Sequence, residues 1–137
     1  MKKYILAIFL CLLGACTLLQ AQDTQKINKK NLVIKEWNSP AGSSKKVLDH
    51  QTIYNSDGKK IEEKEYGSYG LKWTKRYEYD ASGKVSRELA YDERNKLVTI
   101  KKIEYNEFGR KKIQYTYDAK NRLVSTKTFE YLAEDSD

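Results

Sequence analysis

From about residue 31 to residue 131, short runs of alternating apolar and polar residues follow one another, and most of them end at a tyrosine. Two of the clearest are LVTIKKIEY (97–105) and LVSTKTFEY (123–131). Runs rich in Val, Ile, Thr, Tyr and Phe are typical of half-buried β-strands. The pattern predicts an all-β fold with eight strands, at about residues 31–37, 45–54, 59–66, 71–79, 84–91, 96–105, 110–117 and 122–131.

The predicted strands are separated by a turn sequence that repeats. It reads Tyr, Asp or Asn, two free residues, Gly or Asn, then Lys or Arg, and it occurs as YNSDGK (54–59), YDASGK (79–84), YDERNK (91–96), YNEFGR (105–110) and YDAKNR (117–122). A sixth copy, YGSYGL (66–71), lacks the acid and the base. Asp or Asn accepts hydrogen bonds from backbone amides ahead of it, and Gly or Asn adopts the left-handed conformation that follows. Each copy therefore predicts a tight hairpin that ends in a bulge.

Strands joined by tight hairpins are antiparallel neighbours, so the predicted architecture is a β-meander. We expect an open, curled single sheet. The alternative is closure of the eight strands into an up-and-down barrel. Lys101, Lys111 and Lys127 argue against a dry barrel lumen, although their long stems can reach out along an apolar surface.

The sheet is predicted to have one apolar, aromatic face and one wet face. The turn geometry predicts three cross-strand pairs: Tyr79 with Val85, Tyr91 with Leu97, and Tyr117 with Leu123. Counting every second residue from these pairs gives the apolar face: Val85, Arg87, Leu89, Tyr91, Leu97, Thr99, Lys101, Ile103, Tyr105, Lys111, Ile113, Tyr115, Tyr117, Leu123, Ser125, Lys127, Phe129 and Tyr131. The opposite face carries mainly polar residues, with Val98, Ile100 and Val124 among them. An irregularity is expected at the YGSYGL segment.

The first residues have the composition of an export signal. A basic start precedes the apolar run 4–19, which is too short for a comfortable membrane span. We predict a signal peptide over residues 1–21, removed in the mature protein. Two alternatives stay open: lipidation of Cys16 within the lipobox-like sequence LGAC, or an uncleaved anchor. All three predict export to the periplasm, the outer envelope or the exterior.

Composition limits the chemistry of the mature chain. Residues 22–30 are predicted to form a polar leader, 31–132 a single β-repeat domain, and 133–137 an acidic tail. Loss of the signal lowers the net charge from +7 to +5 and removes both cysteines, which leaves one histidine and no thiol. A disulfide framework and a multi-histidine metal site are therefore excluded, and we expect no cofactor.

The segments YDASGKV, YDERNKL, YNEFGRK and YDAKNRL resemble the YD repeat of RHS-type bacterial surface and toxin proteins. They are also similar to the β-hairpin repeats of MORN-like antitoxin proteins. The resemblance covers roughly residues 54–131. It implies an extracellular or envelope sheet of tandem hairpins, sometimes with carbohydrate or protein binding, and it supplies no catalytic residues. The size and the signal resemble those of small exported β-repeat proteins of Gram-negative bacteria whose function is unknown.

The residues that could support catalysis have simpler explanations. His50 lies beside Asp49 without a nucleophile motif, so we interpret it as a partly exposed strand histidine. Glu62, Glu63 and Glu65 alternate with lysines, as in cross-strand charge pairing, and not as in a glycosidase carboxylate pair. We expect no catalytic residue and no enzyme. The alternative is a small envelope hydrolase that uses these carboxylates.

The aromatic side chains are the strongest functional signal. Planar, amphipathic rings suit the binding of sugar rings or of a protein surface. The predicted ligand-binding residues are Trp73, Tyr77, Tyr79, Tyr105, Tyr115 and Tyr117. Nucleic acid is not expected, since the charge is mild and the chain is exported, and a membrane is expected only through the signal or a lipid at Cys16. The predicted function is a non-catalytic exported binding or structural module for a glycan or protein partner. An antitoxin- or immunity-like protein is a further alternative.

Overall fold

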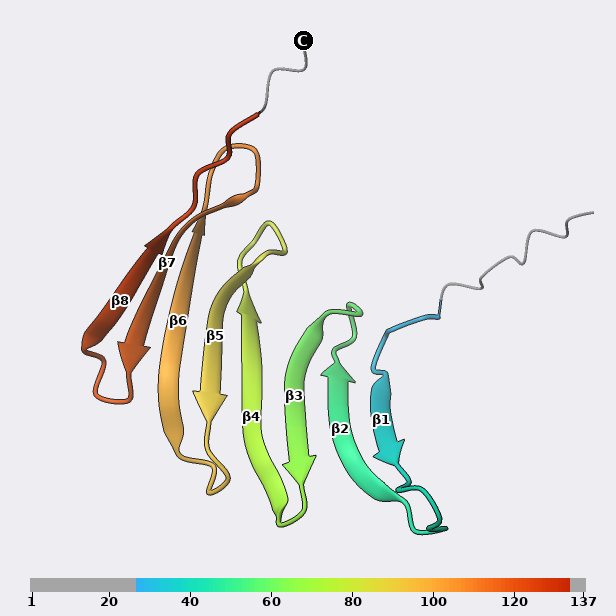
Figure 1. Ribbon diagram of the computed structural model, residues 1–137. Helices are drawn as coiled ribbons and strands as arrows, with labels where there is room; N and C mark the ends of the chain where they lie inside the picture. The colour runs from blue at the N-terminus through green and yellow to red at the C-terminus, as the bar shows by residue number, and fades with distance from the viewer. Residues whose placement is uncertain (1–26, 134–137) are drawn as a thin grey trace, which may run out of the picture.

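The computed structural model describes residues 27–133. They form one antiparallel sheet of eight strands in chain order. The strands are β1 (Val33–Asn38), β2 (Val47–Tyr54), β3 (Lys60–Gly67), β4 (Gly70–Tyr79), β5 (Val85–Tyr91), β6 (Leu97–Tyr105), β7 (Lys111–Asp118) and β8 (Leu123–Thr128). β1 and β8 lie at opposite ends of the twisted sheet (Figure 1), so the predicted open meander is confirmed and the barrel alternative is wrong.

Some expectations fall outside the described residues. These are the signal peptide, the Cys16 alternative, most of the leader, and the tail from residue 134. Within residues 27–133, no helix is long and apolar enough to cross a membrane.

The repeated turns have the predicted hydrogen bonds. In the turn at 79–84, the Gly83 amide donates to the Asp80 carbonyl at 3.0 Å, and the Lys84 amide donates to Asp80 Oδ1 at 2.9 Å. Gly83 has a φ of 83°, in the left-handed region. The turns at 54–59, 79–84 and 105–110 lie along the upper edge of the sheet in Figure 1, and those at 66–71, 91–96 and 117–122 along the lower edge.

The irregularity expected at YGSYGL is present. Pairing between β3 and β4 continues to Gly67 and Gly70, so only Ser68 and Tyr69 form the loop. In the other repeated turns the last pair joins the tyrosine to the residue six positions later, as in Tyr91 and Leu97.

Every pair of neighbouring strands contains a β-bulge next to its hairpin end. In the β5–β6 pair, Ala90 pairs with Thr99 while Tyr91 pairs with Leu97, so Val98 is an extra residue. The predicted tyrosine pairs are therefore confirmed, but the extra residue shifts the alternation beyond them. Leu97 and Ile100 lie on one face of the sheet, whereas Thr99, Lys101 and Ile103 lie on the other.

The prediction of a single aromatic face is therefore wrong, and chirality explains why. Consider the axis that lies in the plane of the sheet and runs across the strands. A rotation of 180° about this axis, with a shift along it, superposes an upper-edge hairpin on the lower-edge hairpin that follows. That half-turn exchanges the two faces, and a mirror image is not available to L-residues. Equivalent tyrosines of successive hairpins consequently face opposite sides, Tyr79 and Tyr105 on one face and Tyr91 and Tyr117 on the other.

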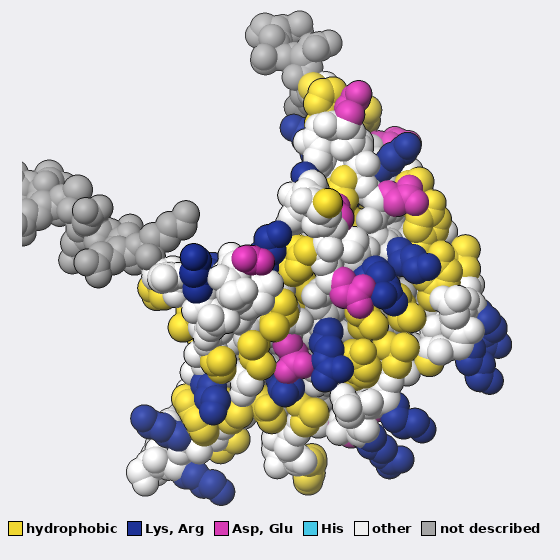
Figure 2. Space-filling view, turned by 180° about the vertical axis from the view of Figure 1, so that it is seen from behind, with side chains coloured by type: hydrophobic (Ala, Val, Ile, Leu, Met, Phe, Trp, Pro, Cys, Tyr) yellow, Lys and Arg dark blue, Asp and Glu magenta, His cyan; other side chains and the backbone are white. Residues whose placement is uncertain are grey.

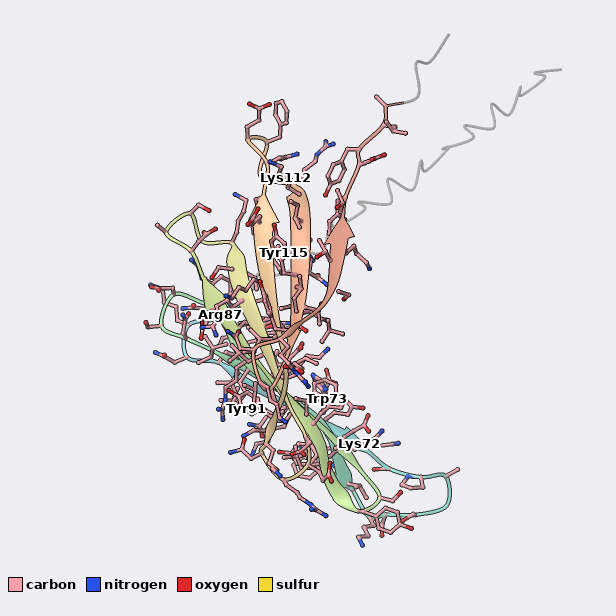
Figure 3. All side chains as sticks on the ribbon, turned by 90° about the vertical axis from the view of Figure 1, so that its left-hand side faces the viewer. Lys72, Trp73, Arg87, Tyr91, Lys112 and Tyr115 are labelled. Carbon is pink, nitrogen blue, oxygen red and sulfur yellow. The ribbon has the colours of Figure 1, made fainter. Side chains whose placement is uncertain are left out.

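We name the two faces by one residue each. The Trp73 face carries Tyr54, Trp73, Lys75, Tyr77, Tyr79, Lys101, Ile103, Tyr105 and Lys127, and the Tyr91 face carries Arg76, Arg87, Leu89, Tyr91, Ile100, Lys102, Tyr115 and Tyr117. Figure 3 shows Lys72 and Trp73 on one side of the ribbon and Arg87 and Tyr91 on the other.

Each face has only a small core, because no second layer covers it. Among the described residues, the buried hydrophobic side chains are Ile100 on the Tyr91 face and Ile103 on the Trp73 face. Thr74 and Thr52 are the buried polar ones. Most of the aromatic strand residues are half-buried, so contacts between neighbouring strands, more than a common core, hold the sheet together.

Candidate ligand-binding face

The six predicted ligand-binding residues do not form one group. Four of them lie on the Trp73 face: Trp73, Tyr77, Tyr79 and Tyr105. The other two, Tyr115 and Tyr117, lie on the Tyr91 face. All six are half-buried. A single ligand contacting the sheet from one side reaches at most four of them.

The hydroxyl groups of Tyr79 and Tyr105 are used within the sheet. Tyr79 Oη donates to the Lys60 carbonyl at 2.6 Å, and Tyr105 Oη donates to the Val85 carbonyl at 2.8 Å. Each tyrosine thus reaches across to the strand before its own, at the upper edge. Burial raises the pKa of both tyrosines, which keeps the donors protonated.

The rings of the same two tyrosines are also covered from within the chain. Lys59 Nζ lies 5.1 Å from the centroid of the Tyr79 ring, and Lys84 Nζ lies 5.9 Å from that of Tyr105. In each case the lysine comes from the preceding upper-edge turn. Tyr79 and Tyr105 therefore connect consecutive hairpins, which is a structural role.

Tyr77 is held by a polar cluster. Its hydroxyl donates to Glu63, and Lys60 Nζ donates to Glu63 Oε1 at 2.6 Å while lying 4.8 Å from the Tyr77 ring centroid. Burial and the hydrogen bond to Glu63 raise the pKa of Tyr77. Burial alone would raise the pKa of Glu63, but its hydrogen bonds with Lys60 and Tyr77 outweigh this and lower it. The cluster is therefore a neutral phenol beside an ionised, paired carboxylate.

Of the six predicted residues, Trp73 keeps its ring surface and its indole N–H most available to a ligand. Its ring meets that of His50 edge-on, with centroids 6.2 Å apart and an interplanar angle of 69°. His50 Nδ1 lies 2.9 Å from Glu65 Oε2, and Lys75 Nζ lies 4.8 Å from the indole centroid. Within residues 27–133 no side chain or backbone group hydrogen-bonds the indole N–H. The half-exposed indole is thus flanked by the His50 ring, the Glu65 carboxylate and the Lys75 ammonium group.

The sequence interpretation missed the partners of Trp73. His50 lies in β2 and is half-buried, as predicted, but its partner is Glu65 of β3 and not the adjacent Asp49. The register could have revealed this pair. In each of the β2–β3, β4–β5 and β6–β7 pairs, the residue four before the upper-edge tyrosine pairs with the residue one before the lower-edge tyrosine.

The carboxylates considered for hydrolysis are divided between the faces. Glu63 and Glu65 lie on the Trp73 face, whereas Glu62 lies on the Tyr91 face, where it binds Arg76 Nε and Lys64 Nζ, each at 2.9 Å. Burial opposes ionisation of Glu62, yet these two hydrogen bonds prevail and lower its pKa. A glycosidase acid needs a raised pKa and a facing second carboxylate.

The Tyr91 face is mixed in character. Figure 2 shows hydrophobic side chains there with basic and acidic ones among them. Lys102 Nζ lies 4.9 Å from the Tyr117 ring centroid, and Arg87 Nη1 pairs with Glu78 Oε2 at 2.7 Å. Charged groups thus lie among the apolar side chains on this side, and one of them lies over an aromatic ring.

A clear depression of the described surface lies elsewhere, at the lower edge. It has a volume of about 670 Å³ and is formed by the loop after β1, the start of β2 and the β3–β4 turn, with Pro40, Leu48 and Tyr66 in its lining. None of the six predicted residues lines it. The Trp73 ring lies outside this depression, on the open face of the sheet.

Comparison with protein-family models finds no matching family, and comparison with curated proteins finds no significant match. The resemblance to YD and MORN-like repeats therefore stays a prediction from the turn sequences.

Proposed function

We propose that the protein is a non-catalytic, exported binding module whose Trp73 face binds a glycan. The observation that carries the proposal is the group formed by Trp73, His50, Glu65 and Lys75. Its indole offers an apolar plane for a sugar ring, and its indole N–H is free to donate. The neighbouring Glu65 carboxylate and Lys75 ammonium group are suited to hydrogen bonds with sugar hydroxyl groups.

The charge balance of this surface favours a neutral ligand. Around Trp73 and Tyr77, Lys60 and Lys75 are offset by Glu63 and Glu65, so this part of the face has no net charge that would concentrate an anionic polymer. A protein partner that presents a similar polar surface is the alternative.

The non-catalytic part of the proposal is supported by the state of the carboxylates. The pKa values of Glu62 and Glu63 are lowered, and Glu65 is hydrogen-bonded to His50. Ionised and paired carboxylates do not serve as general acids at neutral pH.

The test is a glycan array probed with the purified protein and two variants. We expect Trp73→Ala to lose about fivefold or more in affinity for the captured glycan, as a lost stacking platform of about 1 to 3 kcal/mol requires. Tyr115→Ala, on the opposite face, is the matched control and should bind like the wild type. Urea unfolding of all three proteins shows whether the sheet is intact.

Three results would contradict the proposal. An array with no captured glycan removes the ligand class, and equal loss in both variants removes the site. Turnover of a captured glycan removes the non-catalytic role.

A further inference from the structure

The two outermost strands of the sheet have no neighbour on their outer side among the described residues (Figure 1). All six residues of β8 are exposed, with Leu123 at 56% and Val124 at 64%. In β1, Val33 and Trp37 are 48% and 54% exposed. Unpaired edges with apolar side chains are templates for further strand pairing.

We infer that β8 of one copy of this protein pairs with β1 of a second copy and so continues the sheet end to end. The strand number permits this geometry. With eight antiparallel strands, β1 and β8 run in opposite directions, so a second copy in the same orientation adds an antiparallel strand. Two successive hairpins restore the original face, so the Trp73 face of one copy continues into that of the next.

The repeat also predicts the register of this contact. Three strand pairs within the sheet are joined by upper-edge hairpins. In each of them, the residue four positions before the upper-edge tyrosine pairs with the residue directly before the lower-edge tyrosine. The pairs are His50 with Glu65, Lys75 with Ala90, and Lys101 with Thr116. On β8 the residue four before Tyr131 is Lys127. On β1 the residue before the aromatic Trp37 is Glu36. The same register therefore places Lys127 opposite Glu36 of the second copy.

The charges at these positions match. The first internal pair, His50 with Glu65, has the same basic and acidic order and is hydrogen-bonded at 2.9 Å. Within residues 27–133, neither Lys127 nor Glu36 forms an ion pair. Lys127 Nζ lies 6.0 Å from the centroid of the Phe129 ring. The end-to-end contact supplies a partner for both charges.

A single strand edge is smaller than a standard protein interface, so the association should be reversible and should grow with concentration. It is a head-to-tail contact that does not close on itself, and it yields chains of copies of unequal length. It is also separate from glycan binding at Trp73, so either proposal can fail while the other holds.

The test is a charge swap followed by sedimentation velocity of the purified protein over a range of concentrations. Lys127→Glu places two carboxylates opposite each other and Glu36→Lys places two ammonium groups there. Each variant alone should associate about five- to tenfold more weakly than the wild type. Mixing the two variants, or combining both changes in one chain, should restore association. These residues lie at opposite ends of the sheet, so rescue has no explanation within one copy.

A second variant blocks the edge without changing charge. The Phe129 amide donates to Lys112 of β7, so by alternation the Thr126 amide points outward from β8. Thr126→Pro should abolish association and leave unfolding nearly unchanged, since proline is tolerated on sheet edges.

Four outcomes would overturn the inference. They are a wild type that stays monomeric at every concentration, a Thr126→Pro variant that associates like the wild type, a failure of the mixture to recover, or a Glu36→Lys variant that behaves as wild type. The last result would indicate pairing of β8 with a second β8.

Discussion

The upper and lower edges of the sheet use the same repeated turn but differ in the residue at its left-handed position. Glycine occupies this position in all three upper-edge turns, at Gly58, Gly83 and Gly109. Asparagine occupies it in two lower-edge turns, at Asn95 and Asn121, with φ values of 60° and 61°. Both residue types tolerate the conformation, so the turn itself does not explain the difference.

The lysine of the preceding upper-edge hairpin provides a reason at two of the three glycines, Gly83 and Gly109, whereas at Gly58 an added Cβ would meet nothing closer than 3.5 Å. A Cβ atom at Gly83 would lie 2.8 Å from Lys59 Nζ, and one at Gly109 would lie 2.9 Å from Lys84 Cε. These are the lysines that cover Tyr79 and Tyr105. At the lower edge the cation over the Tyr117 ring is Lys102, which belongs to a strand and not to a turn. The glycine therefore makes room for a contact between hairpins.

The tyrosine hydroxyls differ between the edges in the same way. The upper-edge hydroxyls of Tyr79, Tyr105 and Tyr131 each donate to a backbone carbonyl of an earlier strand. At the lower edge, the Tyr117 hydroxyl has no such acceptor within residues 27–133. The upper edge is thus the one at which consecutive hairpins are joined by side chains.

The largest expected effect comes from removing an upper-edge tyrosine. Tyr105→Ala should lower the free energy of unfolding by about 3 kcal/mol. The change removes half-buried aromatic surface, a hydrogen bond and the ring that Lys84 contacts. Tyr117→Ala removes a ring without that hydrogen bond, so its loss in free energy of unfolding should be smaller by about 1 kcal/mol. Equilibrium urea unfolding measures both.

Phenylalanine variants isolate the hydroxyl. Tyr105→Phe should cost about 1 kcal/mol and Tyr117→Phe close to nothing. Equal losses in the two phenylalanine variants would show that the edges do not differ in this bond.

The exchange of turn residues should have a smaller effect. Gly83→Asn should lower the free energy of unfolding by about 1 kcal/mol, because its Cβ displaces Lys59 from the Tyr79 ring. Asn95→Gly, the reverse change at the lower edge, should be nearly neutral. Thermal and urea unfolding of the two variants provide the measurement.

A double-mutant cycle identifies the cause of that loss. In a Lys59→Ala background, Gly83→Asn should cost clearly less than in the wild type. An unchanged cost would mean that the glycine is required for some reason other than the lysine.

The smallest expected effect is a local response to acid. Hydrogen bonds from the Arg122 amide and guanidinium hold the pKa of Asp118 below its ordinary value. The stabilisation from this lowered pKa is present above the ordinary Asp pKa of about 4 and is lost as the pH falls through the lowered one. The upper-edge turn at 105–110 has Asn106 in the same place, which does not titrate.

NMR titration of the backbone amides separates these two turns. The Arg122 amide signal should titrate with a midpoint below about 4, and the Arg110 amide signal should lack that transition. A shared midpoint would indicate global acid unfolding, and a midpoint at or above the ordinary value would contradict the lowered pKa.

Much of the fold could be predicted from the sequence, because each hairpin is determined locally. Asp80 receives its hydrogen bonds from residues two to four positions away, and Gly83 adopts its conformation without help from distant groups. Strand number, order and the tyrosine pairs followed from such turns. The candidate site was predicted less well, since the six residues were expected on one face, whereas Tyr115 and Tyr117 lie opposite the other four, and Glu65 was not recognised as the partner of His50.

The reason is that faces depend on the bulges, and contacts between side chains depend on register. Val98 and its equivalents insert one residue into each strand pair, which reverses the alternation counted from the turns. The chirality of the repeated hairpin is sufficient to predict that the faces alternate.

The amino-acid sequence by itself determined where the chain turns and which strands are neighbours, because these depend on hydrogen bonds between residues close in the chain. Only the tertiary structure decided that the sheet stays open, and that Lys59 and Lys84 cover the tyrosines of the next upper hairpin. Twist accumulates over many strands, and a side chain that reaches another hairpin depends on that accumulated shape.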